Sequence, residues 1–147
     1  MLILHSWLRW AALIFGVAAT VNAFRHRAHA GEPPPGQRWD WFFMLALDLQ
    51  ALFGLVLYFG FSPFTREAFS NVGLAVRDPG LRFWAITHVA TMIVALVAVR
   101  AGRVMAMTSP SPARRRGRYL CFAVAVAAMV AGVPWPGLAN GRPLFRF

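Results

Sequence analysis

The stretch that decides the fold runs from Trp41 to Phe61 and reads WFFMLALDLQALFGLVLYFGF. Only Asp48 and Gln50 interrupt its run of mostly apolar side chains, and aromatic residues stand at both of its ends. At about 1.5 Å of rise per residue, a helix of this length crosses a hydrocarbon core of about 30 Å. Aromatic side chains are enriched where such a helix meets the membrane surface. The stretch therefore predicts a transmembrane helix.

Three further apolar stretches lie outward from this one, over residues 2–24, 83–99 and 119–133, and they too predict transmembrane helices. No positive charge precedes the first stretch, and it is longer than the apolar region of a secretory signal peptide. We therefore expect it to be a membrane helix. The connecting segments carry prolines, glycines and charges, which predict loops. In residues 62–81 apolar and polar groups alternate, which favours a short segment lying on the membrane surface.

The composition agrees with a protein built almost entirely of such helices. Of the 147 residues, 59% are hydrophobic and 14% are charged, whereas soluble domains average about 45–50% and about 25%. Four spans of about 20 residues use more than half of a chain of this size. We therefore expect a single all-α domain over residues 1–147, an integral membrane four-helix bundle of up-down topology, because short loops make successive helices antiparallel.

The distribution of positive charge predicts the orientation of this bundle. Fifteen arginines, no lysine and five acidic residues give a formal charge of +10. The arginines cluster at the ends of the apolar stretches, where they meet lipid head groups, so we expect the lipid membrane and not a nucleic acid as the partner. The first and third connections hold nine arginines, and the second connection and the C-terminal tail hold five. The positive-inside rule then places both termini on the non-cytoplasmic side.

Four ionisable residues inside the predicted spans are candidate functional residues: His5, Arg9, Asp48 and His88. A charged group at the bilayer centre costs about 2.5–3.5 kcal/mol on insertion scales, so such residues are usually functional. His5 and His88 lie on different helices at similar depths, about 5 and about 8 Å from the outer boundary. Two neutral imidazoles at one level could bind a metal or a haem iron. The alternative is that each is only hydrogen-bonded to a nearby carbonyl or hydroxyl group.

Asp48 lies deeper, about 15–20 Å from the outer surface, which is too far to share a metal with His5. Arg9 is the nearest cation by depth, so we expect an Arg9–Asp48 ion pair between the first two helices. The alternative is proton transfer through Asp48. The chain has no glycine-rich phosphate loop, no paired catalytic carboxylates, no Cys-x-x-Cys-His haem attachment motif and no hydrolase triad. We therefore predict no catalytic residue.

Four short stretches carry a resemblance to a known family: His5-Ser6-Trp7-Leu8-Arg9-Trp10, residues 50–59, Arg82-Phe83-Trp84-Ala85-Ile86-Thr87-His88 and Val133-Pro134-Trp135-Pro136. In them the chain resembles the small bacterial four-helix membrane proteins commonly labelled cytochrome b-like. The resemblance implies a place in the bacterial inner membrane and a haem b held by His5 and His88, with Arg9 near a haem propionate or Asp48. Where the family usually has a histidine, this chain has Asp48.

Three functions follow as expectations. The first is an accessory or structural subunit of a larger energy-converting membrane complex, respiratory or photosynthetic, which packs against other integral membrane subunits. The second is a haem-b-binding electron-transfer protein with His5 and His88 as ligands. The third is a proton-coupled transporter that uses Asp48, although four helices with one buried acid leave little room for a substrate path.

Overall fold

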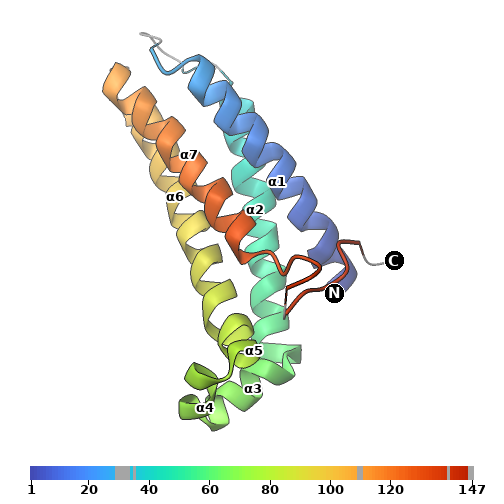
Figure 1. Ribbon diagram of the computed structural model, residues 1–147. Coiled ribbons are helices and arrows are strands. Elements are labelled where there is room, and N and C mark those ends of the chain that lie inside the picture. Colours follow the sequence, from blue (N-terminus) through green and yellow to red (C-terminus); the bar gives the residue numbers. More distant parts are fainter. Residues whose placement is uncertain (29–33, 35, 109–110, 139, 146–147) are drawn as a thin grey trace.

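The computed structural model describes residues 1–28, 34, 36–108, 111–138 and 140–145, and every regular element in these ranges is a helix. The all-α class predicted from the sequence is therefore confirmed. Four long helices run alongside one another: α1 (Leu2–Arg25), α2 (Gln37–Val56), α6 (His88–Thr108) and α7 (Pro112–Gly132) (Figure 1). α1 packs against α2 and α7, and α6 packs against α7 and α2.

Both α2 and α6 carry a π-helical turn at the same end of the molecule. η1 (Leu57–Phe61) follows α2, and η2 (Phe83–Thr87) precedes α6. The Tyr58 hydroxyl in η1 donates a 2.8 Å hydrogen bond to the Ala85 carbonyl oxygen in η2, which ties the two turns together. Such turns are rare and occur frequently at functional sites.

Three short helices connect η1 to η2 and lie together at this end of the molecule (Figure 1). They are α3 (Pro63–Ser70), α4 (Val72–Arg77) and α5 (Pro79–Arg82). Each begins where a side chain accepts a hydrogen bond from a free backbone N–H group, from Ser62, Asn71 and Asp78 in turn. These caps explain why the segment forms short helices; its expected place on the membrane surface stays a prediction.

Three helices are long and apolar enough to cross a membrane: Leu2–Arg25, Gln37–Phe61 and Pro79–Thr108. Their most apolar windows are only 22–28% buried within the protein, so most of their surface faces outward, as in a membrane protein. α7 is not among them, because arginines occupy its first two turns.

Three helices extend further than the sequence predicted, and the first of them, α2, begins at Gln37 and not at residue 41. The third apolar stretch was expected to end near residue 99, but α6 continues to Thr108, because Arg100 and Arg103 lie in a helix that their good helix propensity supports. The basic segment before residue 119 was expected to be a loop, but it forms the start of α7. Ser111 caps this helix by accepting from the Arg114 N–H group, and Pro112 occupies its first turn.

Candidate functional site

A cavity of about 400 Å³ lies between α2 and α6, next to the two π-helical turns. Its walls are mostly apolar, with a few polar side chains among them: His5, Gln50, Tyr58, Ser62, His88 and Arg142. A smaller cavity of about 90 Å³ shares several of these residues and also contacts Arg9. A mostly apolar cavity with a few convergent polar groups is the usual form of a ligand or cofactor site.

The structure brings His5 and His88 together at this cavity, from α1 and from the first turn of α6. Their ring centroids are 6.4 Å apart, and the ring planes are inclined by 67°. Two metal–nitrogen bonds of about 2 Å, with about 1 Å from each nitrogen to its ring centre, need a separation of about 6 Å. The two rings therefore lie at a distance at which they could share one metal ion.

Each imidazole has one nitrogen that is hydrogen-bonded. His88 Nδ1 lies 2.7 Å from the Gly132 carbonyl oxygen, which can only accept, so Nδ1 carries the proton and Nε2 carries the lone pair. His88 Nε2 has no hydrogen-bond partner in the described parts of the chain. A histidine whose other nitrogen donates to a carbonyl is the usual arrangement of a metal-binding histidine.

His5 and Gln50 form a second polar pair in the same cavity. His5 Nε2 lies 3.1 Å from Gln50 Nε2. His5 Nδ1 and Gln50 Oε1 are both buried and lack a hydrogen-bond partner among the described residues. Buried polar atoms are nearly always satisfied in native proteins. This pair therefore has spare bonding capacity that a bound group could use.

Local backbone features prepare the cavity for these side chains. The π-helical turn η2 ends where the His88 N–H group bonds to the Phe83 carbonyl oxygen, and it leaves Trp84 and His88 lining the same cavity. On α2, Gly54 faces His5: a Cβ atom at this position would lie 3.2 Å from His5 Cε1. The missing side chain lets the His5 ring approach the helix backbone closely.

Arg142 in the C-terminal tail lines the cavity, and no pattern in the sequence predicted this. Its backbone N–H group bonds to the Pro134 carbonyl oxygen, which folds the tail back. The guanidinium lies 5.4 Å from the centre of the Trp84 ring and 6.0 Å from that of Phe64. No acidic side chain pairs with it in the described residues. Arg142 therefore supplies a positive charge that is available to a ligand.

Arg9 and Asp48 do not form the ion pair expected from the sequence. Arg9 donates to the Leu144 carbonyl oxygen in the tail and lies 3.4 Å from the Ser6 hydroxyl. Asp48 instead pairs with Arg100 at 2.8 Å. The prediction was wrong because it ended the third span at residue 99, whereas the longer α6 carries Arg100 alongside α2. Asp48 lines neither cavity.

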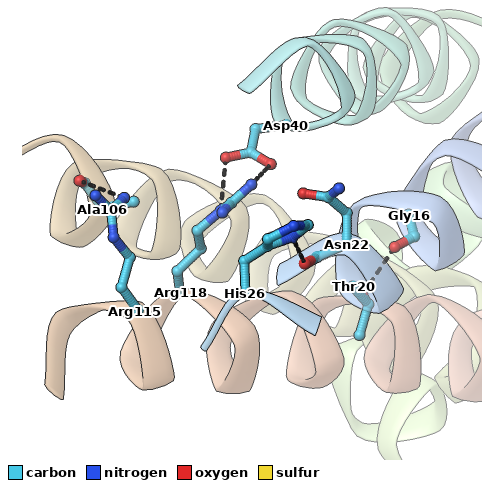
Figure 2. Close-up of polar contacts among 8 residues, drawn as sticks. All are labelled: Gly16, Thr20, Asn22, His26, Asp40, Ala106, Arg115 and Arg118. Atoms are coloured by element: carbon cyan, nitrogen blue, oxygen red, sulfur yellow. Dashed lines mark hydrogen bonds and ion pairs between the residues drawn. The ribbon is translucent and has the colours of Figure 1, made fainter. Parts of the chain in front are cut away.

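A second polar cluster lies at the opposite end of the four long helices (Figure 2). Asp40 of α2 accepts two hydrogen bonds from Arg118 of α7, at 2.6 and 2.8 Å, and the two side chains are only 4% and 1% exposed. Beside them the buried Arg115 side chain donates to the Ala106 carbonyl oxygen of α6. The paired charges and the full burial indicate a role in joining helices.

The described residues hold no cluster of three or more His, Cys, Asp or Glu side chains that could bind a metal ion without further ligands. A haem iron is a different case, because the porphyrin supplies four nitrogen ligands and the protein needs to supply only one or two. The histidine pair, the unsatisfied polar atoms of His5 and Gln50, and the apolar cavity that these residues line fit a haem.

No protein-family model, no curated protein and no solved structure matches the chain. The resemblance to cytochrome b-like proteins therefore stays a prediction.

Proposed function

We propose that the protein is a small integral membrane electron-transfer protein that binds haem b between His5 and His88. The observation that carries this proposal is the convergence of the two imidazoles, from helices far apart in the sequence, on one large apolar cavity. When bound, haem b would supply a one-electron redox couple. His88 would use its Nε2 atom as a ligand, held in the required tautomer by Gly132.

His5 is the proposed second ligand, and Gln50 orients its ring. As placed, the Gln50 amide nitrogen donates to His5 Nε2, so His5 Nδ1 carries the proton. Ligation by His5 would require the Gln50 amide to turn over, so that Oε1 accepts from Nε2–H and His5 Nδ1 holds the lone pair. The walls of the cavity are mostly apolar, and Arg142 among them would balance negative charge on the occupant. Burial, hydrogen bonds and nearby charge are the features by which a protein sets the potential of a haem.

The proposal includes the placement in the membrane. In it, α1, α2 with η1, α6 with η2, and α7 span the bacterial inner membrane as an up-down bundle with both termini on the non-cytoplasmic side. Three of these helices meet the length and hydropathy of a membrane span. The fourth, α7, would be accommodated because Asp40 neutralises Arg118 inside the protein. The cavity would then lie in the non-cytoplasmic half.

A spectrum of the protein purified in detergent, from cells supplied with a haem precursor, tests haem binding. We expect a Soret band that shifts on reduction, and we expect it to be lost in His88→Ala and strongly weakened or shifted in His5→Ala. His26→Ala is the matched control, because this histidine lies at the end of α1, far from the cavity, and should leave the spectrum unchanged. Wild-type protein without a Soret band, or variants with an unaltered band, would rule out the proposal.

Arg142 provides a second test at the same cavity. The Arg142→Gln substitution removes a positive charge from the cavity wall. It is expected to weaken binding of haem, which carries two propionates, by about tenfold or more, since a hydrogen bond to a charged group contributes about 1.5–3 kcal/mol. Haem titration followed at the Soret band measures this. The haem dimethyl ester is the control ligand, and its affinity should not change; an equal loss for both ligands would contradict a role in anion binding.

An accessory subunit without a cofactor remains the second candidate, because the same scaffold could pack against other membrane subunits. The cavity and its convergent polar groups favour the haem-binding role, since a purely structural subunit has no use for them. The transporter role receives less support, because Asp48 is paired with Arg100 and lies outside both cavities.

A further inference from the structure

The ion pair between Asp48 and Arg100 is placed unusually for a membrane protein. It joins α2 to α6 on their outer surface, and 34% of the Asp48 side chain and 50% of the Arg100 side chain are exposed. The buried Asp40–Arg118 pair, by contrast, is enclosed between α2 and α7. The two charged side chains of this interhelix contact are thus partly exposed on an otherwise apolar surface.

The depth of this pair makes the exposure costly. Asp48 lies about three turns into α2, about 16 Å from its start, and Arg100 lies about 12 Å from the end of α6. With these helices across a hydrocarbon core of about 30 Å, Asp48 lies well inside it. Charged residues at such depth almost always face other protein groups and not lipid. The exposed side of the pair therefore calls for a protein partner.

The surface around the pair is suited to helix packing. One turn away from Asp48 on α2 lie Leu45 and Leu52, and one turn away from Arg100 on α6 lie Val97 and Val104. All four are exposed, by 38–61%. We call these four residues, with Asp48 and Arg100, the ion-pair face.

We propose that the ion-pair face packs against the same face of a second copy of this chain, as a two-fold dimer in the membrane. The charges argue for this partner. Asp48 and Arg100 lie side by side on neighbouring helices, so the pair is a dipole directed across the bundle. A two-fold axis along the membrane normal reverses this dipole, which sets Asp48 of each copy toward Arg100 of the other. A two-fold contact requires this self-complementarity.

This inference rests on the membrane insertion proposed above and not on haem binding. Cysteine cross-linking in isolated membranes tests it, in a background in which the sole cysteine is removed by Cys121→Ala. Single cysteines replace Leu45, Leu52, Val97 or Val104, and an oxidant is added. We expect a disulfide-linked dimer at one or more of these positions.

Two controls carry cysteine at other exposed positions, Ile14→Cys on α1 and Val124→Cys on α7. Ile14 is 65% exposed and Val97 61%, and the two residues lie equally far from the Arg25 and Thr108 ends of their helices. The controls should form no dimer. Membranes are washed at alkaline pH before oxidation, which removes proteins that are not inserted. Release of the protein by this wash would contradict membrane insertion, and it would not bear on the dimer.

The charges are tested in the best cross-linking variant. Asp48→Asn and Arg100→Gln should each weaken dimerisation about thirtyfold, since the two-fold dimer loses the contact twice and a polar contact between membrane helices contributes about 1 kcal/mol. The exchanged pair, Asp48→Arg with Arg100→Asp, should restore the band. A band equally strong in all variants, no dimer at any position of the face, or cross-linking only to a different protein would overturn the proposal.

Discussion

Replacing Asp40 with alanine is expected to lower the free energy of unfolding by about 3–5 kcal/mol, which is the usual cost of removing one partner from a buried ion pair. The substitution leaves the Arg118 guanidinium, 1% exposed, without the carboxylate that accepts two of its hydrogen bonds. Denaturation of the protein in detergent, followed by circular dichroism, measures the change.

The matched control for Asp40 is Asp48→Ala, which breaks the half-exposed pair with Arg100. In detergent it should cost about 1 kcal/mol or less, because exposed ion pairs contribute little. The double variant Asp40→Leu with Arg118→Met should recover much of the lost stability, since apolar side chains of similar size can replace a buried pair. Equal losses in the free energy of unfolding for Asp40→Ala and Asp48→Ala would show that burial does not increase the contribution of the Asp40–Arg118 pair to stability.

Gly132→Ala is expected to cause the second largest loss of stability, because it alters the packing of α7 on α6. It is also expected to affect the proposed haem site next to His88. A Cβ atom at residue 132 would overlap Thr91 Oγ1 and lie 2.5 Å from Met92 Cε, so the Thr91 side chain, which donates to the His88 carbonyl oxygen, or the backbone of α7 must shift. Overpacking of this kind costs about 1–3 kcal/mol. A shift at residue 132 would also displace the carbonyl oxygen that accepts from His88 Nδ1. We therefore expect both lower stability and weaker haem binding.

Gly60→Ala is the matched control for this prediction, because a Cβ atom at Gly60 would meet no atom within 4 Å. It should change stability by no more than a few tenths of a kcal/mol, apart from the backbone preference of alanine. Thermal unfolding and the haem titration are measured on both variants. A Gly132→Ala protein that melts like the wild type would show that the contact between α6 and α7 adapts without loss.

The helical class and the juxtaposition of His5 with His88 could be predicted from the sequence because both depend on simple regularities. Long apolar runs give helices, and the depth of a residue along a helix follows from its number. Depth alone, however, does not say which side chains face one another. For this reason the sequence predicted an ion pair between Asp48 and Arg9, whereas in the structure Asp48 pairs with Arg100 on the adjacent α6.

The ends of the helices were harder to predict, and the second polar cluster was missed for this reason. Asp40 and Arg118 were both assigned to loops, although both lie within helices. One signal was present: Ser111-Pro112 is typical of a helix start, and it places Arg115 and Arg118 on one face of a helix. Arg142 had no such signal, because the tail reaches the cavity through an irregular turn that no periodicity describes.

The arginines of α7 also affect the order in which the helices can assemble during synthesis. A ribosome synthesises α2 long before α7, so the Asp40 carboxylate has no Arg118 to neutralise it until the last helix emerges. That last helix, in turn, is too polar in its first half to partition into lipid alone. In the membrane placement proposed above, α7 would enter the bilayer together with α6, against helices already in place, and the least apolar of the four long helices would complete the assembly.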